Sequence, residues 1–189
     1  MNNNKNCYTI ILKYLGGLFF LIPLLHPFFL AILLITNFPD NKKYEISKKR
    51  ALTLIRLISV FLPIIISANI LSAHLLSDRV PQKIVQSISS SGNLLIINCF
   101  SIIVVSPIVE ELYFRKILFQ ELLHRFGSMW TIILSSIYFS FVHLNVLSLP
   151  TLFALGLLLG TVAQVTKSII FCMLVHSLFN LSMLFLLIF

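Results

Sequence analysis

Long apolar runs separated by short polar breaks constrain the fold of this chain more than any other feature. Of its 189 residues, 58% are hydrophobic and only 11% are charged, whereas soluble domains carry about 25% charged residues. A bilayer offers no water to backbone N–H and C=O groups, so a run that spans it must form a helix. We therefore predict an all-α, polytopic membrane protein with about six transmembrane helices. The predicted helices cover about residues 8–36, 51–76, 94–126, 128–147, 151–165 and 169–189.

The order of these runs divides the chain into two regions. Residues 1–93 contain the first two spans and a Ser-rich connection, and residues 94–189 contain the other four helices. The loop at residues 40–50 carries five Lys and Arg, which is typical of a cytoplasmic loop. The net charge of +8 is thus a topology signal, and no soluble basic domain is present to bind nucleic acid. We expect a multi-pass protein of a cell membrane, with the lipid bilayer around it.

Two adjacent carboxylates interrupt the third apolar run. Residues 106–115 read Ser-Pro-Ile-Val-Glu-Glu-Leu-Tyr-Phe-Arg, which places Glu110 and Glu111 at membrane depth. Ionisable groups there are costly, and they normally have partners and a function. Ser106 and Pro107 predict that a helix begins at this point, because serine is a good N-cap and proline suits the first turn.

Helical spacing predicts different roles for the two acids. Glu111 and Arg115 form an i, i+4 pair with the acid first, which is the favourable order. Glu110 lies about 100° around the helix from Glu111. One acid is therefore expected to hold Arg115 while the other faces a pocket. A structural ion pair alone would also explain Glu111 and Arg115.

Polar residues of later helices are expected at the same depth. Glu111 and His143 each lie sixteen residues from the turn predicted at Gly127, which is about 24 Å along two antiparallel helices. His176 and Asn180 are four residues apart, so they share one helix face. The spacing predicts a buried polar layer shared by three helices.

Three motifs follow one another on separate apolar helices: Glu110-Glu111-x-x-x-Arg115, Phe139-x-x-x-His143 and His176-x-x-x-Asn180. In this order they resemble the CPBP family, which comprises type II CAAX prenyl endopeptidases and bacteriocin-processing or Abi-type membrane proteases. The resemblance covers roughly residues 94–189. It implies a bacterial intramembrane endopeptidase that hydrolyses a peptide bond of a membrane-associated peptide or protein, as in CAAX-type, leader or bacteriocin processing.

The resemblance also implies catalytic roles, and elementary chemistry agrees with them. Amide hydrolysis needs an activated water, a proton donor for the leaving amine, and hydrogen-bond donors for the developing oxyanion. Glu110, with or without Glu111, is the expected general base, and His143 would position the water. His176 and Asn180 would stabilise the oxyanion. Arg115 and Phe139 would bind substrate or support the site.

Three alternatives stay open from the sequence. Glu110, His143 and His176 could ligate zinc with a water in the fourth position, so the cofactor is either none or zinc. A non-catalytic bacteriocin immunity or scaffold protein could share the fold. A proton-coupled transporter would use buried Glu and His as a relay, but the sequence has no inverted repeat of the kind such proteins show.

Overall fold

The computed structural model describes residues 48–75 and 94–188, and all regular structure within these two ranges is helical. The predicted all-α class is therefore confirmed. The span predicted at residues 8–36 and the basic loop up to residue 47 lie outside the described residues. The helices are α3 (Lys48–Leu75), α5 (Leu94–Phe100), α6 (Ser106–Glu111), α7 (Phe119–Val142), α8 (Leu149–Thr166) and α9 (Ile169–Ile188), with shorter π and 3-10 segments between them.

Three helical stretches of the described chain are long and apolar enough to cross a membrane. They are Ala51–Leu71, Ile96–Val142 and Val146–Thr166, and a shorter apolar helix covers Ile169–Phe185. The 47-residue stretch reverses direction at Gly127, whose φ of 71° and ψ of 176° suit glycine. The turn predicted at this glycine is confirmed.

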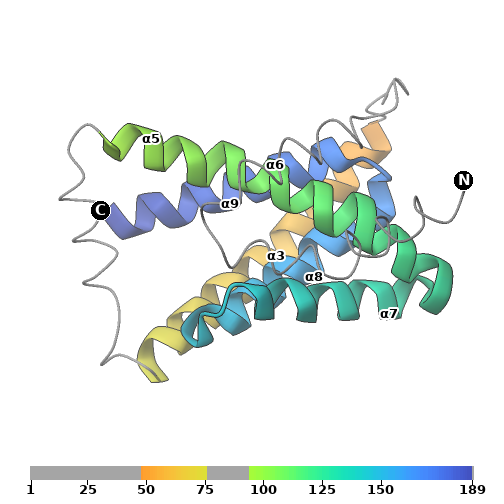
Figure 1. The fold of residues 1–189 in the computed structure, drawn as a ribbon, viewed down its shortest axis with the longest axis horizontal. Helices are drawn as coiled ribbons and strands as arrows, with labels where there is room; N and C mark the ends of the chain where they lie inside the picture. The colour runs from red at the N-terminus through yellow and green to blue at the C-terminus, as the bar shows by residue number, and fades with distance from the viewer. Residues whose placement is uncertain (1–47, 76–93, 189) are drawn as a thin grey trace, which may run out of the picture.

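The helices are arranged in two groups (Figure 1). α8 packs between α3 and α7, while α9 lies along the helix that contains α5 and α6. The end of α8 lies near the part of α7 that follows Gly127, since the side-chain amide of Gln164 donates to the hydroxyl of Ser128 at 2.5 Å.

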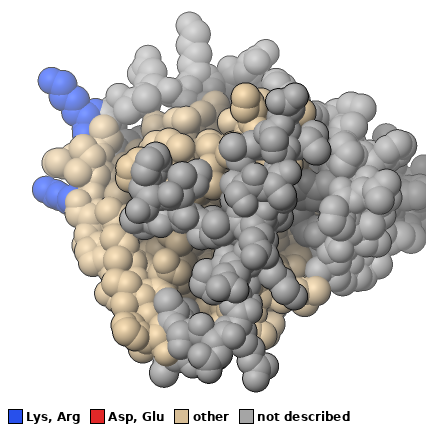
Figure 2. All heavy atoms as spheres, turned by 90° about the vertical axis from the view of Figure 1, so that its left-hand side faces the viewer, with Lys and Arg blue, Asp and Glu red and all other residues tan. Residues whose placement is uncertain are grey.

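Figure 2 shows the other end of the molecule, where α5 begins and α9 ends. The described surface visible there has Lys and Arg only at its margin and no Asp or Glu.

The helix of the acid pair does not begin at Ser106, contrary to the interpretation of Ser106 and Pro107 as a helix start, whereas the helix predicted over about residues 94–126 is continuous here. Backbone angles stay helical through Phe100, Val105, Ser106 and Leu112, so the helix runs from Leu94 through Leu118 and into α7. It contains two π-helical turns, η3 (Ser101–Val105) and η4 (Leu112–Leu118), on either side of α6. Ser106 makes no capping bond to the backbone, because its hydroxyl donates to Glu110 instead.

The helix predicted at residues 128–147 ends earlier than expected, at Val142. His143 has the last helical backbone angles, and Leu144 takes a positive φ of 48°. The side chain of Asn145 then accepts a hydrogen bond from the backbone N–H of Leu147 and begins a 3-10 turn, η5 (Val146–Ser148). His143 therefore lies at the end of the helix, directly before the exposed residue Leu144.

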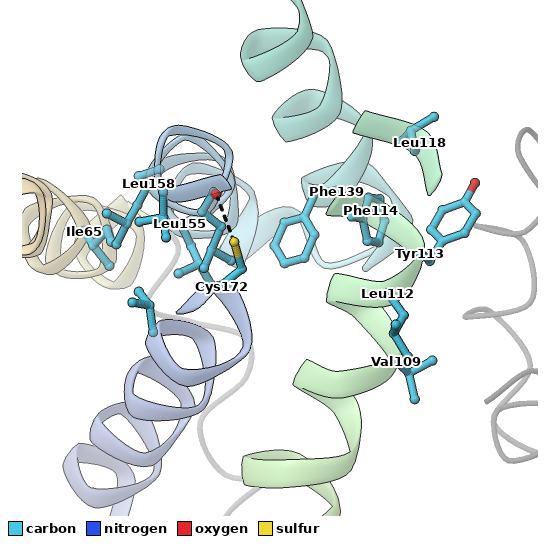
Figure 3. Packing of buried hydrophobic residues seen from close by; sticks show 14 of the residues in the cluster. Ile65, Val109, Leu112, Tyr113, Phe114, Leu118, Phe139, Leu155, Leu158 and Cys172 are labelled. Atoms are coloured by element: carbon cyan, nitrogen blue, oxygen red, sulfur yellow. Dashed lines mark hydrogen bonds between the residues drawn. The ribbon is translucent and has the colours of Figure 1, made fainter. Parts of the chain in front are cut away.

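The core lies between these two groups of helices. Figure 3 shows Phe139 of α7 between Phe114, on the helix of the acid pair, and a group that includes Leu155 of α8 and Cys172 of α9. The Cys172 thiol donates to backbone carbonyls, as a small buried residue does. Leu54 and Ile65 of α3 belong to the same buried cluster.

Two glycines of α8 at small-x-x-x-small spacing, Gly156 and Gly160, allow α7 and α8 to approach closely. A Cβ atom at Gly156 would lie 2.9 Å from the Cα of Ser136, and one at Gly160 would lie 3.2 Å from a methyl carbon of Ile132. Only the second neighbour is a side-chain tip that can shift. Gly156 is thus the tighter of the two contacts.

We expect Gly156→Ala to destabilise the protein by about 1–3 kcal/mol, because the added methyl group must push two backbones apart. Gly160→Ala serves as the matched control and should cost less, since Ile132 can rotate away. Thermal unfolding of the purified variants in detergent measures both effects. Equal costs at the two glycines would contradict this account of the helix contact.

Candidate active site

Glu110 is the acid that faces the other polar motifs. Its Oε1 accepts a hydrogen bond from the hydroxyl of Ser106, one turn earlier on the same helix. Its Oε2 is buried and has no hydrogen bond to any described residue. This oxygen lies 3.6 Å from Nε2 of His143 and 3.8 Å from Nε2 of His176. Side chains of α6, α7 and α9 thus meet at one point, as the helical spacing predicted.

Hydrogen bonds on the far side of each imidazole determine which nitrogen faces Glu110. Nδ1 of His143 lies 2.7 Å from the carbonyl oxygen of Phe139, and Nδ1 of His176 lies 2.9 Å from Oε1 of Glu111. A carbonyl and a carboxylate only accept, so the hydrogen-bond network assigns a hydrogen to each Nδ1. In the neutral rings both Nε2 atoms then present lone pairs toward Oε2 of Glu110.

Glu111 and Arg115 form a buried ion pair that joins several helices. The Nε of Arg115 lies 3.1 Å from Oε2 of Glu111, and both side chains are at most 1% exposed. The guanidinium also donates to the hydroxyl of Ser135 on α7 and to the carbonyl oxygen of Gly156 on α8, both at 3.2 Å. The other oxygen of Glu111 binds His176 on α9. Glu111 therefore holds Arg115 and one nitrogen of His176, while Glu110 faces the Nε2 atoms of both histidines. The two acids thus have different roles, as their angular separation predicted.

Phe139 contacts both the ion pair and the histidines. Its ring centroid lies 5.7 Å from the Cζ of Arg115, 5.7 Å from the ring centroid of His176 and 4.8 Å from that of His143. The ring is fully buried, and the backbone carbonyl of the same residue binds His143. Phe139 therefore packs against the site and also orients one of its rings.

Asn180 lies one helical turn after His176 and faces the same long helix as that histidine does. Its side-chain Nδ2 donates to the carbonyl oxygen of Ile102 at 2.9 Å. Ile102 belongs to the π-helical turn η3 that precedes the acid pair. The structure thus gives the Asn180 amide a backbone partner, and this amide makes no hydrogen bond to Glu110 or to the two histidines.

Two contacts of the site were not recognised from the sequence. Ser106 was interpreted as a helix cap, although it lies four residues before Glu110, the spacing that brings two helical side chains together. Ser135 had no sequence signal beyond being a polar residue in an apolar helix. Its partner Arg115 lies on another helix, and only the tertiary structure brings them together.

The site is exposed mainly at one edge. The side chain of His143 is 30% exposed, whereas those of Glu110 and His176 are 7% and 3% exposed. His143 ends α7, and the exposed residues Leu144 and Val146 follow it. An incoming molecule would therefore reach the cluster from the end of α7 that lies away from Gly127.

The positions of the three expected zinc ligands do not match a bound ion in this arrangement. Zinc takes N and O ligands at about 2.0–2.2 Å in a tetrahedron, which separates neighbouring ligand atoms by roughly 3.3–3.6 Å. Glu110 Oε2 lies 3.6 Å from Nε2 of His143, at the end of this range, and 3.8 Å from Nε2 of His176, which is beyond it. Among the described residues, no group of three or more His, Cys, Asp or Glu is placed to hold a metal ion. The zinc alternative stays a prediction.

We expect Arg115→Met to lower the stability by about 3–5 kcal/mol, because the carboxylate of Glu111 would stay buried without its cation. Adding Glu111→Gln should restore part of this loss, since no buried charge would then be left unpaired. Arg125→Met is the matched control: the Arg125–Glu121 pair has the same i, i+4 spacing but is exposed, and its loss should cost less than about 1 kcal/mol. Thermal unfolding in detergent measures all three, and similar effects for Arg115 and Arg125 would contradict the buried role.

A comparison with known families agrees with this geometry. Residues 92–182 match a family model described as Type II CAAX prenyl endopeptidase Rce1-like. The matched segment contains all three motifs and every side chain of the Glu110 cluster. No curated protein and no solved structure matches the chain.

Proposed function

Since this chain belongs, through residues 92–182, to the Rce1-like family of type II CAAX prenyl endopeptidases, we propose that it hydrolyses a peptide bond by a water molecule held between Glu110 and His143. The family implies a membrane protease that acts on membrane-associated proteins. The observation that carries the mechanism is the approach of Nε2 of His143 and of His176 to the unbonded Oε2 of Glu110.

The hydrogen-bond character of Oε2 of Glu110 and Nε2 of His143 favours a water molecule between them. Each presents a lone pair when His143 is neutral, and two acceptors that face each other need a donor between them. A water has two O–H donors, so it can bind Oε2 of Glu110 and Nε2 of His143 at once. Its own oxygen lone pair then stays free to attack a carbonyl carbon.

Glu110 would act first as general base and then as general acid. It takes a proton from the water as the oxygen attacks the carbonyl carbon, and the protonated carboxyl group then gives this proton to the leaving amine. Ser106 occupies Oε1, so the proton is handled by Oε2, which faces the reacting atoms. His143 keeps the water oriented through Nε2 because Phe139 holds its Nδ1.

His176 and Asn180 would stabilise the oxyanion of the tetrahedral intermediate. His176 donates from Nε2 only when both ring nitrogens carry a hydrogen, and in that form its Nδ1–H faces the carboxylate of Glu111. Asn180 retains a second N–H on Nδ2 beside the one that binds Ile102. Two donors from neighbouring turns of α9 would then meet the negative charge as it develops.

The substrate would be a membrane-associated peptide whose cleavage site is extended. A helical segment hides its amide groups in its own hydrogen bonds, so the scissile carbonyl is accessible only in an extended backbone. We propose a CAAX-type tail or a leader or bacteriocin precursor as the substrate. Entry beside His143 would bring such a segment directly to the proposed water, since this is the most exposed part of the cluster.

We expect Glu110→Gln and His143→Ala each to reduce cleavage at least about a hundredfold, because one removes the base and the other releases the water. The assay follows cleavage of a farnesylated CAAX peptide by protein reconstituted in liposomes. Glu121→Gln is the control, since this acid pairs with Arg125 outside the cluster and should leave cleavage unchanged. Near-normal cleavage by either site variant at normal abundance would refute the assignment.

We expect cleavage to survive chelation, because a His and an Asn one turn apart suit an oxyanion site better than a ligand set. Purified protein should then contain far less than one zinc per chain by elemental analysis. A zinc enzyme would instead contain about one metal per chain and lose activity with 1,10-phenanthroline. Metal content gives an answer even if the chosen peptide is not a substrate.

A further inference from the structure

We propose that Pro107 is a positioning residue for Asn180: it leaves the carbonyl oxygen of Ile102 without a backbone donor, and this oxygen holds the Asn180 side chain. The catalytic consequence of this inference rests on the proposed function, whereas the contact itself does not. Pro107 is buried in α6 and lies three residues before Glu110.

The backbone around Pro107 lacks both of the donors that could normally reach Ile102. In an α-helix this carbonyl would accept from the N–H of Ser106, four residues on. In the structure the Ser106 N–H donates to Ser101 instead and closes a π-helical turn. In continued π-helical geometry the donor would be residue 107, five residues on, but proline has no N–H.

The proline also gives a reason for the π-helical turn itself. Inside an α-helix its ring would clash with the carbonyl group four residues earlier, that of Ile103. One extra residue in the turn changes this alignment, and π-bulges of this kind are frequent at functional sites. The proline and the turn η3 (Ser101–Val105) together thus produce an unbonded carbonyl group just before the acid pair.

Asn180 satisfies this carbonyl from a different helix. Its Nδ2 lies 2.9 Å from the oxygen of Ile102, which is 78 residues away along the chain. An unpaired backbone carbonyl is costly in an apolar medium, so the bond is favourable for both groups. Figure 1 shows α9 running beside the α5–α6 helix, and one turn earlier on α9 His176 bonds to Glu111. Two successive turns of α9 are therefore fixed to the helix of the acid pair.

This contact would determine the direction of the second amide hydrogen of Asn180. The two hydrogens of Nδ2 lie in one plane with the amide group, so a bond from one to Ile102 restricts where the other can point. A donor that is already oriented needs no rearrangement when the oxyanion forms. Pro107 would in this way influence catalysis without touching the substrate.

A double-mutant cycle on stability tests the contact independently of any activity. Asn180→Ala should lower the melting temperature by about 2 °C in the native background. In a Pro107→Ala background it should lower it by less than half as much, because alanine restores a backbone N–H that competes for the Ile102 carbonyl. Pro107→Val, which conserves more of the buried volume, provides the same comparison if the alanine variant does not accumulate.

Pro63 offers a matched control, since it also lies inside a helix but belongs to α3. In a Pro63→Ala background, Asn180→Ala should keep its full effect on the melting temperature. An equal effect of Asn180→Ala in the native, Pro63→Ala and Pro107→Ala backgrounds would overturn the inference. This outcome is independent of whether the protein cleaves the chosen peptide.

Kinetics with the farnesylated CAAX peptide test the catalytic consequence. Pro107→Ala should lower kcat by about tenfold with little change in KM, as expected for a misplaced oxyanion donor. The Pro107→Ala/Asn180→Ala double variant should be no slower than Asn180→Ala alone, whereas Pro63→Ala should keep the native kcat. Losses that multiply in the double variant would show that Pro107 acts on something other than Asn180 and would overturn the positioning role.

Discussion

The buried ion pair between Arg115 and Glu111 is the interaction on which the rest of this structure depends. Both side chains are almost inaccessible, and charges in such surroundings are stable only when their remaining donors and acceptors are satisfied. Ser135, the Gly156 carbonyl and His176 provide these partners from three other helices. The requirement to satisfy one guanidinium and one carboxylate thus fixes how α7, α8 and α9 meet the helix of the acids.

The orientation of the reactive groups follows from this arrangement. Glu111 holds one nitrogen of His176, and this leaves the other nitrogen to face Glu110. Phe139 does the same for His143 through its backbone carbonyl, while its ring packs against both imidazoles. His176 and His143 are therefore held by Glu111 and by the Phe139 carbonyl, neither of which faces the proposed water. This is the kind of support that a preoriented active site needs.

The long apolar runs were enough to predict the all-α class, Gly127 predicted the turn, and helical spacing predicted the different directions of the two acids. These features depend on local sequence, which is read directly. The interpretation of Ser106 and Pro107 as a helix start was wrong, because local capping preference could not reveal that a π-helical turn lets the helix continue through the proline. The partner of Asn180 was missed for the same reason, since the unbonded carbonyl exists only because of that turn.

The continuity of the helix has a consequence for the electric field at Glu110. A helix that began at Ser106 would have placed the positive end of its macrodipole beside this carboxylate, but that effect fades within the first turn. In the structure the helix already includes Leu94, which lies sixteen residues and about 24 Å before Glu110. The backbone dipole therefore contributes little there. The stabilisation of the negative charge falls instead to individual side chains, of which the hydroxyl of Ser106 is the nearest donor, so the proposed base can be tuned one residue at a time.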